Sequence, residues 1–192
     1  APGVGKGTQA VELAKKFKEQ GYNTYAYHNN SYAFQDRHKY LKSQGFTNYK
    51  GCYNGMEKLI NCKIWPQSDL SMFDKTTKDY IDSEKPFLAY YMTVSGHMDY
   101  TRTGNTIVNK NYKLVKHLDY SERVKGFIAT QIELDKALEL LIQRLEEKGK
   151  LEDTVIVLLA DHYPYRLETE QINEVSTYKR DGVVGVNHNS LI

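Results

Sequence analysis

The sequence has few of the residues that mark specialised protein classes, since its 192 residues include two cysteines, one tryptophan and four prolines. No run reaches the roughly 18 apolar residues of a membrane-spanning helix, and the first residues do not form a signal peptide. Any membrane anchor of the parent protein is therefore expected outside this chain. An excess of one charge is also missing, because 26 basic and 24 acidic residues leave a net charge of +2. With this balance, no nucleic-acid partner is expected.

The two cysteines, Cys52 and Cys62, lie ten residues apart in "CYNGMEKLINC". This arrangement lacks the ligand spacing of a zinc site. In an oxidising compartment the pair could form a disulfide, and in a reducing one the two could be buried thiols. The sequence alone leaves both alternatives open.

Tyrosine, by contrast, is abundant, with 16 residues. Its flat apolar ring and polar tip suit sugar or polyol sites, but they suit the faces of ordinary strands equally well. A chain of this length is expected to form one domain with a sizeable core. We therefore favour a structural role for most of the tyrosines.

The first ten residues, "APGVGKGTQA", resemble the phosphate-binding loop of adenylate kinases. Such a loop needs glycines that wrap a polyphosphate, a lysine that reaches its outer phosphates and a hydroxyl that holds magnesium. The motif's first glycine and the strand that would hold the loop are not in the sequence. We expect residues 1–10 to bind no phosphate, and we divide the chain into an N-terminal helical segment (1–20) and a catalytic-domain segment (21–192).

Segments of strand and helix character alternate along the chain. Strands are predicted from short apolar or aromatic runs, and helices from apolar residues that recur every three to four positions. The predicted strands are 23–27 ("NTYAY"), 86–95 ("PFLAYYMTVS") and 154–161 ("TVIVLLAD"), and the predicted helices are 36–45, 68–82 and 121–150. Ser68 is expected to cap the second helix and Gly149 to end the third.

This alternation predicts an α/β fold with a mainly parallel sheet flanked by helices. The runs at 86–95 and 154–161 are almost wholly apolar, so both are expected to be strands buried on both faces and to share a sheet with 24–27. The final "NHNSLI" is interpreted as the start of a further strand. We therefore expect the fold to be incomplete at both ends.

Polar side chains follow each of the three predicted strands. His28 comes after the first, His97 after the second, and Asp161 and His162 after the third. In open α/β sheets, ligands bind beyond the carboxyl ends of the strands. One histidine in such a place is commonly structural, but three together favour a binding site.

Several blocks of the sequence resemble one enzyme family. They are "YNTYAYHNNSYAFQDRHKYLKSQGFTNY", "PFLAYYMTVSGHMDY", the stretch from "LDYSERVKGF" to "LLADHYPY", and "YKRD" with "NHNSLI". From about Gly21 to Ile192 they are similar to the catalytic domain of lipoteichoic acid synthases and related sulfatase-like phosphoglycerol transferases, in the alkaline phosphatase superfamily. The resemblance implies an alkaline phosphatase/sulfatase-like fold.

The resemblance also implies roles for five residues. Asp161 and His162 match ligands of Mn²⁺, or of another divalent ion such as Mg²⁺, while His97 matches a contact to glycerol phosphate. His28 and Arg37 match residues that line the phosphate pocket. Gln35 stands where the family often has an aromatic residue, so substrate stacking is not expected at that point.

The family's glutamate ligand and threonine nucleophile lie upstream of the block that begins near Gly21, so the catalytic centre of this chain is expected to be incomplete. Thr8, in "GKGT", also follows a Gly-Lys pair, but it is too close to His28 in sequence to match the nucleophile.

The resemblance implies transfer of glycerol phosphate from a lipid such as phosphatidylglycerol to a polymer, at the extracellular face of a bacterial cell membrane. Three alternatives stay open. They are a sulfatase or phosphodiesterase of the same superfamily, a non-catalytic glycerol-phosphate binding module, and a nucleotide-binding protein that uses residues 3–8.

Overall fold

The structure is a computed structural model that describes residues 13–176. The phosphate-loop-like stretch and the terminal "NHNSLI" lie outside these residues. The elements in chain order are α1 (Leu13–Glu19), β1 (Asn23–Ser31), η2 (Phe34–Asp36), α2 (Arg37–Ser43), β2 (Asn48–Cys52), η3 (Met56–Lys58), α3 (Asp69–Thr76), η4 (Thr77–Asp79), β3 (Phe87–Met92), α4 (Thr106–Val115), α5 (Glu122–Glu147) and α6 (Thr169–Val175).

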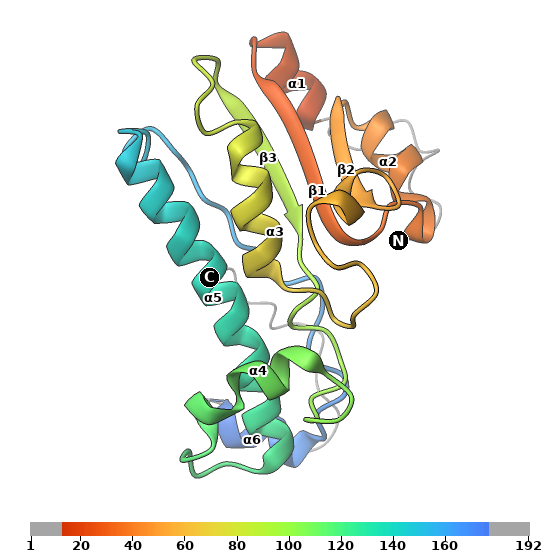
Figure 1. The fold of residues 1–192 in the computed structure, drawn as a ribbon, viewed down its shortest axis with the longest axis vertical. Coiled ribbons are helices and arrows are strands. Elements are labelled where there is room, and N and C mark those ends of the chain that lie inside the picture. The colour runs from red at the N-terminus through yellow and green to blue at the C-terminus, as the bar shows by residue number, and fades with distance from the viewer. Residues whose placement is uncertain (1–12, 177–192) are drawn as a thin grey trace.

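The three strands form a parallel sheet in the order β2-β1-β3 (Figure 1). Tyr25 of β1 lies opposite Asn48 of β2 and Ala89 of β3, and His28 lies opposite Met92 at the end of β3. The middle of β1 is buried without interruption, as expected for a central parallel strand covered on both faces. The predicted α/β class with a parallel sheet is confirmed.

Tyrosines build much of the core between the sheet, α3 and α5. The ring of Tyr91 stacks on Phe73 at 3.9 Å between centroids and lies 4.9 Å from Tyr27. The buried Tyr27 hydroxyl donates to Asp79 over 2.9 Å. Beside α3, the long helix α5 adds Ala137 to this core, and α4 and α6 gather at its first turns (Figure 1). The structural role predicted for the tyrosines agrees with this packing.

Two of the predicted helix boundaries follow from local chemistry. The Ser68 hydroxyl accepts a 3.0 Å hydrogen bond from the Ser71 amide and so caps α3. Gly149 adopts φ +64° after α5, a left-handed conformation that glycine tolerates, and the helix ends there. Among residues 13–176 no helix, α5 included, is both long and apolar enough to cross a membrane.

A disulfide joins Cys52 at the end of β2 to Cys62, ten residues later. It decides between the two alternatives that the sequence left open. The bond closes the loop that contains η3, and the chain then leads into α3.

Two strand predictions need correction. β3 is not buried on both faces, because its residues are half-buried and Tyr90 is 44% exposed at the edge of the sheet. The segment 154–161 forms no strand, and Val155, Val157 and Leu159 are 87%, 69% and 70% exposed. An apolar run favours a strand only where a neighbouring strand offers hydrogen bonds, and in residues 13–176 nothing pairs with this segment.

Candidate functional site

His28 and Arg37 form a hydrogen-bonded pair at the carboxyl end of β1. The imidazole is 2% exposed, with Nδ1 2.9 Å from the Met92 carbonyl oxygen and Nε2 2.6 Å from Nη1 of Arg37. A carbonyl only accepts and a guanidinium only donates, so Nδ1 carries the hydrogen and Nε2 accepts from Arg37. The two contacts fix the tautomer of His28 and use both of its ring nitrogens.

The pKa of His28 is lowered to about 4, mainly by burial; the hydrogen bond to Met92 opposes this shift, and the positive charge of Arg37 adds to it. The imidazole is therefore neutral at physiological pH and acts as an acceptor that orients Arg37. Arg37 itself is half-buried and its Cζ lies 5.3 Å from the Phe34 ring centroid. The remaining N–H groups of its guanidinium suit two oxygens of one phosphate.

The turn before α2 brings Arg37 back to His28. Gln35 and Asp36 have φ values of +52° and +58°, in the left-handed region that non-glycine residues seldom adopt. Both side chains are exposed. Gln35 thus occupies a sharp turn beside the pair, where it offers an amide in place of the aromatic ring that the family often has.

His97 lies in the loop after β3 and His162 lies in the segment after α5, yet their rings are 6.4 Å apart between centroids. The chain bends at Asp161 and His162, as predicted for a pair of neighbours that serve one site. Nδ1 of His162 lies 2.8 Å from the Tyr163 carbonyl, so it donates there and leaves Nε2 for a ligand.

Tyr90 connects the two groups of candidate residues. The pKa of its phenol is raised, mainly by burial. Tyr40 and Asp161 also raise this pKa, whereas Arg37 lowers it. Arg37 and Asp161 therefore both lie within electrostatic range of one residue near the end of β3. The printed contacts bring the predicted residues together in two pairs, His28 with Arg37 and His97 with His162.

The metal-ligand role of Asp161 and His162 stays a prediction. Asp161 and His162 are exposed and supply a carboxylate oxygen and an imidazole nitrogen, which are donor types that Mn²⁺ and Mg²⁺ accept. Among residues 13–176, however, no group of three or more histidine, cysteine, aspartate or glutamate side chains could hold an ion. The described pair fits one side of a coordination shell.

Sequence reasoning missed the buried carboxylate that supports this edge. Asp69, the first residue of α3, is 0% exposed and accepts hydrogen bonds from the amides of Val94 and Ser95 and from the Asn29 side chain (2.9, 3.1 and 2.8 Å). Burial raises its pKa to about 6 against the opposing effect of these bonds. Asp69 thus ties the ends of β1 and β3 to α3. The sequence shows it only as an acidic residue after a helix cap.

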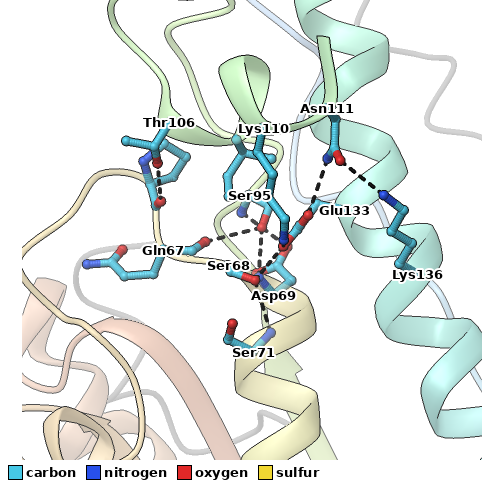
Figure 2. A network of polar contacts seen from close by, with 12 residues as sticks. Gln67, Ser68, Asp69, Ser71, Ser95, Thr106, Lys110, Asn111, Glu133 and Lys136 are labelled. Carbon is cyan, nitrogen blue, oxygen red and sulfur yellow. Dashed lines mark hydrogen bonds and ion pairs between the residues drawn. The ribbon is translucent and has the colours of Figure 1, made fainter. Parts of the chain in front are cut away.

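Glu133 of α5 is a second buried carboxylate beside Asp69 (Figure 2). It accepts from the Ser68 hydroxyl, from Nζ of Lys110 at 2.7 Å and from Nδ2 of Asn111 at 3.2 Å. Burial works to raise its pKa, but the hydrogen bonds from Lys110 and Ser68 outweigh burial and the pKa is lowered. The charged Glu133 joins α3, α4 and α5 behind the candidate site.

Comparisons with known proteins agree with this architecture. The family model described as sulfatase matches residues 3–185. The lipoteichoic acid synthases of Staphylococcus saprophyticus and Staphylococcus aureus (strain USA300) are 28% identical over 148 residues and 26% identical over 156 residues. Each match covers 76% of this chain and 22% of the relative, so the chain spans about a fifth of the length of these curated relatives.

Two solved structures share the fold. The crystal structure of the lipoteichoic acid synthase LtaP from Listeria monocytogenes matches with a TM-score of 0.64 and 22% identity, over 89% of this chain and 43% of that one. A protein of the alkaline phosphatase superfamily from Vibrio parahaemolyticus matches with a TM-score of 0.55 and 18% identity, over 84% of this chain and 39% of that one. The resemblance and the fold predicted from sequence are confirmed, and the chain belongs to the sulfatase family.

Proposed function

We propose that this chain forms the phosphate-binding side of the catalytic centre of a phosphoglycerol transferase similar to lipoteichoic acid synthases. The observation that carries the proposal is the His28–Arg37 pair, in which a neutral buried imidazole accepts from a guanidinium over 2.6 Å. Such a pair holds a permanent positive charge in a fixed direction at the sheet edge where ligands of open α/β folds bind.

In this proposal Arg37 binds two oxygens of the glycerol-phosphate ester, and His28 limits the rotation of the guanidinium. His97 contacts a further phosphate oxygen from the loop after β3. Fixing the phosphate in one orientation lets an attacking hydroxyl approach the phosphorus in line, which is a large part of phosphoryl-transfer catalysis.

Asp161 and His162 would hold Mn²⁺, or Mg²⁺, together with the glutamate and threonine that the family resemblance places upstream of Gly21. When bound, the ion would lower the pKa of the nucleophile and offset charge on the phosphoryl group. Because residues 13–176 offer two donors, we expect this chain to bind manganese weakly and to turn over no ester by itself.

The disulfide supports an extracellular location, because such bonds persist in oxidising compartments. We propose that the parent protein acts at the outer face of a bacterial membrane on a glycerol-phosphate lipid or polymer, through an anchor outside this chain. A sulfatase or phosphodiesterase would use the same anion pocket. A non-catalytic glycerol-phosphate binding module would use the same anion pocket and would need no metal donors.

Titration with sn-glycerol 3-phosphate, followed by NMR, tests the anion pocket. Arg37→Ala should abolish binding, and Arg37→Lys should retain part of it, because lysine keeps the charge without the two-pronged geometry. Lys116→Ala removes an exposed positive charge on α4 and serves as the matched control. Equal binding by wild type and Arg37→Ala would contradict the proposal. A preference for sulfate over glycerol phosphate would favour a sulfatase.

A further inference from the structure

Trp65, the only tryptophan of the chain, lies against the candidate histidine that follows β3. The Trp65 and His97 ring centroids are 5.3 Å apart and their planes meet at 70°, so one ring meets the other edge to face. Nε1 of Trp65 donates a 3.2 Å hydrogen bond to the carbonyl oxygen of Met98, the residue after His97. One side chain thus contacts both the imidazole and the backbone that carries it.

The start of α4 holds both partners in place. Thr106 donates to the Trp65 carbonyl through its amide (3.4 Å) and its hydroxyl (3.3 Å), and the hydroxyl also reaches the Pro66 carbonyl at 3.2 Å. The buried Asn105 side chain donates to the His97 carbonyl at 3.2 Å. Two loops far apart in sequence are therefore fastened to one helix end, which fixes their relative position.

This arrangement leaves one nitrogen of His97 for a ligand. Nδ1 lies 3.4 Å from the same Met98 carbonyl that Trp65 contacts, and an N–H at this position carries the hydrogen because a carbonyl only accepts. Among residues 13–176, Nε2 of His97 has no hydrogen-bond partner. The His162 ring lies 6.4 Å from the His97 ring between centroids, and Trp65 is 39% exposed, so neither histidine nor indole is sealed inside the core.

We propose that Trp65 is a positioning residue for His97, whose indole ring and N–H hold the imidazole so that Nε2 faces a glycerol phosphate bound beside Arg37. Without the indole, the His97 side chain and its loop would gain conformational freedom that binding must then remove. The identity of the ligand rests on the proposed function. The contact between the two rings can be tested without it.

The first measurement is an NMR spectrum of the histidine ring protons without ligand. The indole ring current should displace the His97 signals, which are assigned by their loss in His97→Ala. Trp65→Ala should abolish this displacement. Tyr120→Ala, which removes an aromatic ring of similar exposure between α4 and α5, should preserve it.

The second measurement is a double-mutant cycle on affinity for sn-glycerol 3-phosphate. Trp65→Ala should weaken binding about three- to tenfold, the expected cost of immobilising one freed side chain. Trp65→Phe keeps an aromatic face and should recover most of that loss. In a His97→Ala background Trp65→Ala should have no effect, because a positioning residue acts only through its partner.

The outcomes separate the two proposals. An equal loss of affinity from Trp65→Ala with and without His97, or His97 signals that do not move in Trp65→Ala, would overturn the positioning role. If wild type binds no glycerol phosphate while the His97 signals still move, the proposed function fails and the Trp65–His97 contact stands. If Trp65→Ala does not fold, Trp65→Phe, which keeps a smaller aromatic ring and loses the N–H contact to Met98, supplies both measurements with smaller expected changes.

Discussion

Replacing His28 with glutamine should remove a pH dependence of folding stability that the buried imidazole creates. Its pKa is lowered from 6.5 to about 4, so between these values the unfolded chain holds a proton here that the folded chain does not. The contribution of His28 to stability is therefore complete above pH 6.5 and is lost as the pH falls toward 4. From the two pKa values the loss is about 2 kcal/mol at pH 5 and roughly 3 kcal/mol at pH 4.

Glutamine does not titrate, yet it offers an N–H for the Met92 carbonyl and an oxygen for Arg37. Urea unfolding followed by circular dichroism at pH 7.5 and pH 5 measures the effect. Between these pH values the wild type should lose about 2 kcal/mol more stability than His28→Gln. Groups that titrate equally in both proteins, including Asp69, cancel in this difference.

The exposed His117, at the end of α4, provides the control, because His117→Gln should follow the wild type at both pH values. The reasoning is refuted if the stability difference between His28→Gln and wild type stays constant within about 0.5 kcal/mol from pH 7.5 to pH 5. In that case His28 would have nearly the same pKa in the folded and the unfolded chain, and at pH 5 it would be charged in the folded protein and could not accept from Arg37.

Three further predictions concern stability. Asp69→Ala leaves the buried amides of Val94 and Ser95 without an acceptor and removes one of the two acceptors of the Asn29 side chain, so it should lower the free energy of unfolding by about 3 kcal/mol, measured by urea unfolding at pH 7. An effect below about 1 kcal/mol would show that other groups replace the carboxylate. Changing Cys52 and Cys62 together to serine removes the disulfide that joins residues ten positions apart, and it should reduce the free energy of unfolding by roughly 2–3 kcal/mol. Dithiothreitol should produce the same change in the wild type and none in the variant. Gly126→Ala would place a methyl group 2.1 Å from the Tyr100 carbonyl oxygen, so α5 and the loop after β3 must move apart and the thermal midpoint should fall. A midpoint unchanged from wild type would contradict that close approach.

The sequence predicts those parts of the fold that depend on local chemistry. The cap at Ser68, the left-handed stop at Gly149 and the amphipathic course of α5 each follow from residues within a few positions of one another, and all three are observed. The apolar runs were harder to interpret. Such a run predicts that its side chains avoid water, but it does not predict which strand lies beside it. The sequence therefore predicts the same burial for 86–95 and 154–161, whereas β3 is half-buried and much of 154–161 is exposed.

For the candidate site, too, the sequence predicts some of the residues but not the contacts between them. The positions of His28, His97 and Asp161 after apolar runs indicated one edge of the sheet, and the resemblance added Arg37. The hydrogen bond that makes His28 a neutral acceptor joins residues nine positions apart across a left-handed turn, which no spacing rule predicts. Asp69 and Trp65 were missed because their partners lie about 25 to 33 residues away and become neighbours only in the folded chain.

The exposed course of 154–161 has a consequence for how such a protein can evolve. The residues proposed to bind phosphate lie at the end of β1 and the start of α2, where His28 is 2% exposed and Arg37 is half-buried. Asp161 and His162, by contrast, are exposed at the end of a segment with no strand partner among the described residues. Exposed substitutions of this kind change stability by less than about 0.5 kcal/mol. Selection for a stable fold therefore protects His28 and Arg37 but not Asp161 and His162, so the proposed metal donors could change in one or two mutations while the fold and the proposed anion pocket remain.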